Sequence, residues 1–411
     1  MALDPPVPAA AATRSRRQVP LVVRYRLTPW WLRVGVIWAL SRSITTSLLL
    51  WFADRQGPNA WTGAQPDYFS FASLWDGTWY YVVAVAGYPQ ELPLTADGHV
   101  AENAWAFMPA YPFLVKSLMA VTGVSWHEMA VIVSFVFSLA GALMFYKLMR
   151  LVIPAEAAMF AVVLLCVAPL TPITQVAYAE SMHAFLLTLA LYLLLKRRYG
   201  LLVPVIAVMA LTRPTGLAFA LALILHVLHR WFTRHRDPFP MKERYASVAL
   251  AFFSGLMGLA WPGIAWAVTG SLTAYTDTEL AWRAPYIGYG ELIPFTPWIQ
   301  GADFWMRGPL GIVMLVTLVI GFFVFLATPL VRRLGIDLRA WVLSYVLYLL
   351  AVFFPQSSTF RLLMSIFPLL GAIALPRSRL YRAAVVALFI VGQWYWLSWC
   401  WWVSGYDWTP P

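Results

Sequence analysis

A single carboxylate stands among aromatic residues in the stretch 74–112. Asp76 lies between Trp75 and Trp79, and a second cluster of aromatic residues and prolines closes the stretch at 105–112. Aromatic rings can stack on the C–H face of a sugar, and an isolated carboxylate can accept a proton from a hydroxyl group. The same residues also fit the aromatic belt of a membrane protein, with Asp76 as a solvated acid or a helix N-cap. The stretch therefore indicates either carbohydrate chemistry or an interfacial belt.

A second acid and an imidazole occur together in the segment A-Y-A-E-S-M-H. Glu180 and His183 are three residues apart, so on a helix their side chains share one face. One interpretation places both groups at the edge of a cavity, where they could orient a substrate. The other is a helix cap with a local hydrogen bond, which the same spacing allows.

Two arginines lie at the ends of apolar runs. Arg213 is followed by Pro214, which breaks a helix and removes a donor, and Arg361 begins the run F-R-L-L-M-S. A fixed guanidinium in such a position can bind a phosphate through two parallel hydrogen bonds. Each arginine could instead extend its charge to the membrane surface from a helix end. Two separate arginines favour the phosphate site more than either one alone.

The sequence contains one further pair of acids, Asp277 and Glu279, in a D-x-E pattern. Two carboxylates can hold a divalent cation, although this spacing is common by chance. The two cysteines, Cys166 and Cys400, lie in apolar runs and have no zinc or disulfide spacing. No phosphate-binding loop, dinucleotide fingerprint or hydrolase triad is convincing.

The composition is that of a membrane protein. Of the 411 residues, 61% are hydrophobic and 11% are charged, and the mean hydropathy is +0.70. The apolar runs have helical length and contain Gly and Pro, which favours an all-α bundle over a barrel. The net charge of +11 is best explained by cytoplasmic loops facing anionic lipid, so no nucleic-acid partner is expected.

The distribution of basic residues predicts the topology. Residues 1–28 form a basic cytoplasmic tail, and residues 29–411 form one membrane domain with about eleven spans and a cytoplasmic N-terminus. Residues 53–128 form a long first extracytoplasmic loop, in which the apolar run 111–124 is too short to cross comfortably and is predicted to be interfacial or re-entrant. Most Lys and Arg residues then lie inside and most Asp and Glu residues outside, so carboxylate chemistry is expected on the outer face.

Three short motifs occur in order between residues 74 and 217. They are W-D-G-T-W-Y with G-Y-P and F-M-P-A-Y-P, then A-P-L-T-P-I-T-Q-V-A-Y-A-E-S, and then A-L-T-R-P-T-G-L. Their order and spacing resemble those of the PIG-V-like mannosyltransferases, which belong to the GT-C membrane glycosyltransferases. The later F-R-L-L-M-S-I-F-P is weakly similar to an Arg-containing region of bacterial members. This sequence departs from the family pattern in F-M-P-A-Y-P, where two phenylalanines are more usual, and at Pro214 and Thr215.

The resemblance implies a bundle of GT-C type, a polyprenyl-phosphate sugar donor, usually of mannose, and an active site on the extracytoplasmic face at the cell membrane. It also implies a catalytic acid in the first outer loop, which here falls on Asp76. The acceptor is expected to be a hydroxyl group of a glycolipid or glycan. Both substrates would arrive through the lipid bilayer.

The chemistry of such a transfer assigns roles to the residues above. A lipid phosphate is already a good leaving group, so the site needs a base for the acceptor hydroxyl and positive charge for the released phosphate. Asp76 would be the base, and Arg213 and Arg361 would hold the phosphate. The other expected substrate-binding residues are Trp75, Trp79, Tyr80, Tyr111, Tyr178, Glu180 and His183. The scheme requires no metal or other cofactor, although a divalent cation stays open.

Two other classes of protein compete with this interpretation. A lipid or glycan transporter would also use short, broken helices with charges, but it should show repeats and a charged path open to both sides. A non-catalytic assembly subunit would have no need to gather Asp76 and two outward arginines around one hollow. The glycosyltransferase hypothesis therefore makes a geometric prediction: these three side chains meet at the extracytoplasmic end of the bundle.

Overall fold

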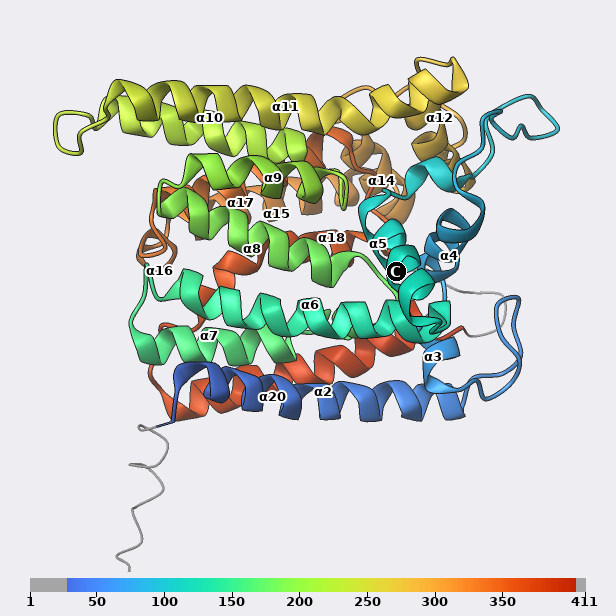
Figure 1. Cartoon of the computed structure of the whole chain (residues 1–411), viewed down its shortest axis with the longest axis horizontal. Helices are drawn as coiled ribbons and strands as arrows, with labels where there is room; N and C mark the ends of the chain where they lie inside the picture. Colours follow the sequence, from blue (N-terminus) through green and yellow to red (C-terminus); the bar gives the residue numbers. More distant parts are fainter. Residues whose placement is uncertain (1–27, 404–411) are drawn as a thin grey trace, which may run out of the picture.

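The structure is a computed structural model that describes residues 28–403, and within them it is helical (Figure 1). Its β structure amounts to one isolated bridge between Leu94 and Val100 in the described residues. The predicted basic tail lies, except for Thr28, outside the described residues. The expected all-α class is confirmed.

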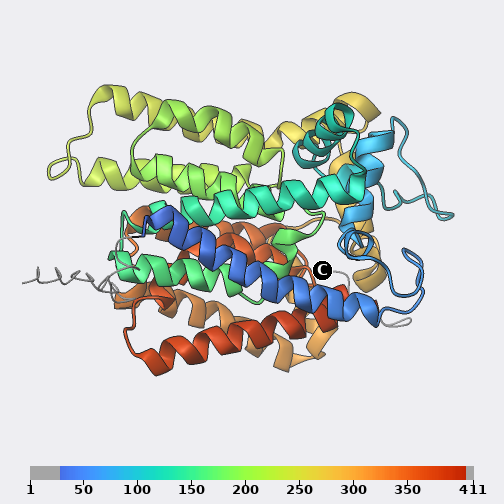
Figure 2. The ribbon, with the colours of Figure 1, turned by 60° about the horizontal axis from the view of Figure 1, so that its bottom comes forward.

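The long helices lie side by side in one bundle, as both views show (Figures 1 and 2). Ten helices and one broken segment of the described residues correspond in number to the roughly eleven predicted spans. The ten helices are α2 (Trp30–Asp54), α6 (Trp126–Met149), α7 (Ala155–Val167), α8 (Glu180–Leu195), α9 (Tyr199–Ala210), α10 (Gly216–Phe232), α11 (Met241–Thr269), α15 (Pro309–Ala327), α17 (Ile336–Val352) and α20 (Arg379–Trp396), which continues as η4 (Leu397–Trp401). The broken segment runs through α18 (Thr359–Leu362), η3 (Leu363–Leu369) and α19 (Leu370–Ile373).

Five described helices are long and apolar enough to cross a membrane, namely α2, α6, α11, α15 and the α20 segment. Others, such as α9 and α10, are apolar but shorter. Short helices can be accommodated where they are covered by protein. These lengths and the composition identify a membrane protein, whereas the orientation in the membrane stays a prediction.

A set of short helices covers one end of the bundle (Figure 1). It consists of α3 (Tyr68–Phe71), α4 (Asp76–Ala86), η1 (Ala104–Ala106), α5 (Ala110–Thr122), α12 (Ala274–Ala281), α13 (Ala284–Ile287) and α14 (Thr296–Met306). The run that was expected to be interfacial or re-entrant is α5, of 13 residues. It stops at Gly123, whose left-handed backbone ends the helix, and Ser125 then starts α6 in a capping box with Glu128.

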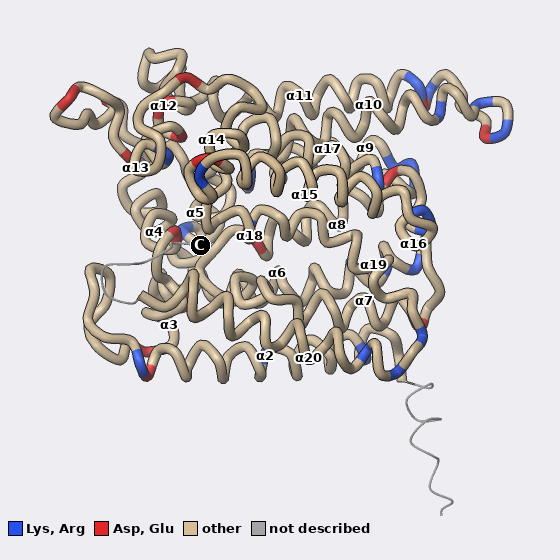
Figure 3. The backbone as a smooth tube through the Cα atoms, turned by 180° about the vertical axis from the view of Figure 1, so that it is seen from behind, with Lys and Arg blue, Asp and Glu red and all other residues tan. Residues whose placement is uncertain are grey.

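Charged residues divide between the two ends of the bundle (Figure 3). Lysines and arginines gather at the end that carries the α10–α11 loop and α16 (Pro329–Arg332). Acidic residues are more frequent at the opposite end, around α4, α12 and α13. The separation follows the pattern predicted from the sequence, and by the positive-inside rule the α4–α12 end would be extracytoplasmic.

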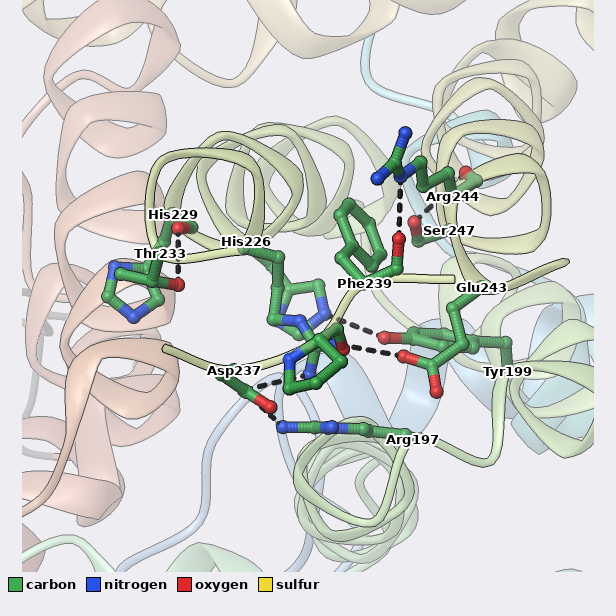
Figure 4. Close-up of polar contacts among 12 residues, drawn as sticks. Arg197, Tyr199, His226, His229, Thr233, Asp237, Phe239, Glu243, Arg244 and Ser247 are labelled. Atoms are coloured by element: carbon green, nitrogen blue, oxygen red, sulfur yellow. Dashed lines mark hydrogen bonds and ion pairs between the residues drawn. The ribbon is translucent and has the colours of Figure 1, made fainter. Parts of the chain in front are cut away.

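A cluster of polar contacts connects helices at the end of the bundle that is rich in Lys and Arg (Figure 4). The Tyr199 hydroxyl and Nε2 of the buried His226 are 2.9 Å apart. Arg230, which is also buried, donates to Asp237 at 3.1 Å and to Glu243 at 2.9 Å. These contacts join α9, α10 and α11, so the buried charges here are partnered and serve packing.

Helix α10, which begins at the last residue of the T-R-P-T-G segment, packs very closely on α11. A Cβ added to Gly216 would lie 2.6 Å from the backbone of Gly258, and one added to Gly258 would lie 2.6 Å from the backbone nitrogen of Leu217. The Ser254 hydroxyl also donates to the Gly216 carbonyl at 2.8 Å. Small residues allow such helices to approach. This contact sets the position of the loop that bears Arg213.

Replacing Gly258 by alanine should therefore destabilise the protein by about 1–3 kcal/mol, because the added methyl group meets backbone that cannot yield. The measurement is thermal unfolding of the purified protein in detergent. Gly255→Ala is the matched control, since its Cβ would have open space on the same helix. Equal melting temperatures for the two variants would show that the α10–α11 contact is not tight.

Candidate active site

A cavity of about 690 Å³ opens where the short helices meet the end of the bundle. Its lining comes from α4, from the start of α8, from the α9–α10 connection, from α12 and from the segment around α18. Charged or polar lining residues include Asp76, Glu102, Glu180, His183, Arg213, Glu279, Arg283, Gln356 and Arg361. Aromatic lining residues include Trp75, Trp79, Trp282, Tyr345 and Tyr348. A largely aromatic and apolar hollow with convergent polar groups is typical of a ligand site.

Four charged side chains from distant parts of the chain form one cluster in this cavity. Asp76 pairs with Arg361, and its carboxylate is 3.9 Å from Arg213. Glu180 pairs with Arg213 and is 3.4 Å from Nε of Arg361. Their side chains are only 7–16% exposed, and the formal charges sum to zero. The convergence of Asp76 with both arginines, expected from the sequence, is present, and Glu180 completes it.

Asp76 is held at the first position of α4 by a hydrogen bond from its backbone to Tyr178 and by the conformation of the preceding residue, Trp75. Its backbone N–H donates to the Tyr178 hydroxyl at 3.0 Å. Trp75 precedes it with φ of 60° and ψ of −124°, a backbone conformation that costs energy for a bulky residue. The Trp75 indole donates to the carbonyl of Trp401 at 2.9 Å, which fixes this turn against the C-terminal segment. The strained turn directs the carboxylate into the cavity.

Glu180 and His183 both line the cavity from the first turn of α8, as their spacing predicted for one helix face. The capping interpretation is wrong for Glu180, because α8 has no side-chain cap and the carboxylate pairs with arginines. Nε2 of His183 is 3.5 Å from the Ser365 hydroxyl. Oε2 of Glu180 and Nδ1 of His183 are buried and make no hydrogen bond within the described residues. These two atoms are free to receive polar groups of a ligand.

The two arginines are fixed inside the cavity. Arg213 lies between α9 and α10, and its carbonyl accepts the N–H of Thr215 at 2.7 Å, which closes a tight turn around Pro214. Arg361 lies in α18, with its guanidinium carbon 5.7 Å from the centre of the Tyr178 ring. Since both side chains are mostly buried and paired with carboxylates, the alternative of arginines extended to the membrane surface is wrong.

The predicted aromatic residues divide into two groups. Trp75 and Trp79 line the cavity, as expected. Tyr80, Tyr111 and Tyr178 are fully buried and are not among its described lining residues.

The direct substrate contact predicted for these tyrosines is therefore corrected to a supporting role. Tyr80 lies one helical turn beyond Asp76, where α4 packs on α5, and its ring meets Tyr111 edge-on at 5.3 Å. The Tyr111 hydroxyl donates to the Ala130 carbonyl at 2.9 Å and so belongs to the α5–α6 contact.

The D-x-E pair does not act as one unit. Asp277 and Glu279 are two positions apart on α12, so their side chains leave different faces of the helix. Glu279 lines the cavity and Asp277 does not. The described residues contain no group of three or more His, Cys, Asp or Glu side chains arranged to hold a metal ion. The helix geometry therefore gives no support to the pair as a cation site, and a cavity role of Glu279 alone was not predicted.

Comparisons with known proteins give structural matches only. No protein-family model and no curated protein sequence matches this chain. One matching structure is the oligosaccharyltransferase of Archaeoglobus fulgidus tethered with an acceptor peptide containing the NVT sequon, with TM-score 0.41 and 13% identity over 87% of this chain and 54% of that chain. Another is the archaeal oligosaccharyltransferase AglB from the same organism in complex with an inhibitory peptide and a dolichol-phosphate, with TM-score 0.35 and 13% identity over 90% and 51%. This chain spans about half the length of both, and at these values its function must be judged from the site itself.

Proposed function

We propose that this protein is a membrane glycosyltransferase of GT-C type that transfers a sugar, mannose by the motif resemblance, from a polyprenyl-phosphate donor to an acceptor hydroxyl. The observation that carries the proposal is the meeting of Asp76, Glu180, Arg213 and Arg361 in one cavity beside Trp75 and Trp79. The charge separation supports the proposal that this cavity is extracytoplasmic and that the protein is a multi-pass protein of the cell membrane.

The transfer needs one proton acceptor and one phosphate site. The acceptor oxygen forms a bond to C1 of the sugar while the bond from C1 to the phosphate oxygen breaks. Asp76 takes the proton of the acceptor hydroxyl, and the lipid phosphate leaves with the bonding electron pair. Arg213 and Arg361 stabilise its negative charge. No protein acid and no cofactor is required, because the phosphate is released as an anion.

The ion pairs seen in the cluster fit this sequence of events. Asp76 pairs with Arg361, so its carboxylate is occupied before substrate arrives. A donor phosphate competes for both guanidinium groups and draws Arg361 toward itself. The Asp76 carboxylate is then free for the acceptor hydroxyl, and Glu180 can turn toward hydroxyl groups of the donor sugar. Binding of the donor thereby prepares the base.

The donor lipid has an apolar route into the cavity along the surface beside the close α10–α11 contact. Leu217 and Leu259 line the cavity, and both are exposed on the surface of the bundle, by 39% and 57%. Pro262, one turn beyond Leu259 on α11, lines the same side. A side chain that faces both the cavity and the apolar surface marks an opening where a polyprenyl chain can lie while its phosphate reaches Arg213.

The direct test is transfer of radiolabelled mannose from polyprenyl-phosphate mannose by the purified protein in lipid nanodiscs, with and without a chelator. An alkyl mannoside serves as a defined acceptor. Product formation that persists with the chelator is the expected result. A protein that moves the donor lipid across a vesicle bilayer and transfers no sugar would instead be a transporter.

A further inference from the structure

The cavity contains a second polar group that the scheme above does not use. It comes from the segment after α11 and from the loop before η1, and it lines the same cavity as the ion-pair cluster. Its members are Glu102, Glu279, Trp282 and Arg283. The Asn103 amide donates to the Thr278 hydroxyl at 2.9 Å, so the loop that bears Glu102 is fastened to α12. The two segments form one wall.

Glu279 is the most enclosed acid of this wall. It is hydrogen-bonded to Tyr275 one turn earlier on α12. Burial raises the pKa of Glu279 above its ordinary value, against the opposing effect of Arg283. Burial also raises the pKa of Glu102. Arg283 donates to the Val352 carbonyl, which draws its guanidinium toward the end of α17. Glu279 therefore resembles a hydroxyl-binding carboxyl group more than the partner of a buried ion pair.

Trp282 contacts Trp79, which lies on the same helix as the proposed base, Asp76. Its ring meets Trp79 edge-on at 5.6 Å and Phe107 edge-on at 5.8 Å, while Trp79 stacks on Phe107. Trp79 is one turn beyond Asp76 on α4. The Trp282 indole nitrogen is buried and has no hydrogen-bond partner among the described residues. An aromatic face, a free N–H and carboxyl oxygens together form the usual surroundings of a sugar ring.

We propose that Glu279 and Trp282 form the acceptor subsite and bind a sugar ring of the acceptor, so that one of its hydroxyl groups reaches Asp76. The donor phosphate and the acceptor then occupy different parts of one cavity: the phosphate lies on Arg213 and Arg361, and the acceptor on Glu279 and Trp282. This inference rests on the proposed glycosyltransferase function and specifies its acceptor class as a carbohydrate.

The experiment measures transfer from polyprenyl-phosphate mannose to octyl α-mannoside, varying each substrate in turn. Glu279→Leu should raise the KM for the octyl mannoside about tenfold or more, because a hydroxyl group loses its partner, and should leave the KM for the donor within about twofold. Glu279→Gln keeps hydrogen-bonding atoms and should recover most of the loss. Asp277→Asn, on the other face of α12, should behave as the wild type.

A second variant tests the subsite independently, in case Glu279→Leu does not fold. Trp282→Phe keeps the aromatic face and removes the indole N–H, so it should also raise the acceptor KM alone. A rise in the donor KM with the acceptor KM unchanged, or no change in either, would overturn the subsite. If the wild type transfers no sugar, both the proposed function and the acceptor subsite are wrong. If the wild type transfers sugar and the Glu279 and Trp282 variants have normal acceptor kinetics, only the subsite is wrong.

Discussion

Replacing Asp76 by asparagine should lower kcat for sugar transfer by about 10²–10⁴-fold, the range that a positioned general base contributes. Asparagine has nearly the same shape and can still accept a hydrogen bond from Arg361, but it cannot take a proton. The KM for the donor should not rise, because Arg213 and Arg361 stay in the cavity and Arg361 loses a competing negative charge. The measurement is a steady-state transfer assay on variants whose melting temperatures match the wild type.

The matched control is Asp54→Asn in the same outer segment. Asp54 lies at the end of α2, is 70% exposed in its side chain and pairs only with the exposed Arg55. A surface ion pair of this kind contributes little, so the variant should transfer at the wild-type rate. Asp76→Asn with an unchanged kcat would show that another group is the base, and Glu180, the other acid of the cluster, would be examined next by Glu180→Gln.

The sequence predicted the charged part of the site well, because charge is expensive in an apolar chain. Asp76, Arg213 and Arg361 stood out as ionisable groups beside apolar runs, and such groups must find partners or water. The partners themselves could not be derived from local spacing. Asp76 and Arg361 are 285 positions apart, and only the tertiary fold brings them together.

The aromatic part of the site was predicted less well, because composition does not show which ring faces a cavity. Trp79 and Tyr80 are neighbours on α4, yet Trp79 lines the cavity and Tyr80 is buried in the core. The role of α12 was missed for a similar reason. Glu279 lies 99 positions after Glu180. Its only local signal was the D-x-E pattern with Asp277, and the helix directs these two side chains to different faces.

Replacing Arg361 by alanine should lower kcat/KM for the donor by about 10²–10³-fold, comparable to the loss of one donor that stabilises a developing negative charge. Arg361→Lys keeps the charge but not the planar pair of donors, so its loss should be smaller. Arg213→Ala should act in the same direction. Added guanidinium ion should partly restore transfer by Arg361→Ala, which a purely structural defect would not allow.

The exposed Arg55 provides the control for Arg361→Ala. Arg55→Ala removes an exposed arginine of the same end of the bundle and should leave donor kinetics unchanged. Removing Arg361 also leaves Asp76 without its closest partner, so unfolding must be measured for each variant, because an unpaired buried charge is destabilising. If Arg361→Ala is folded and binds and uses the donor as the wild type does, the phosphate is held elsewhere. The ion pair with Asp76 would then serve stability, and release of the base by donor binding would be wrong.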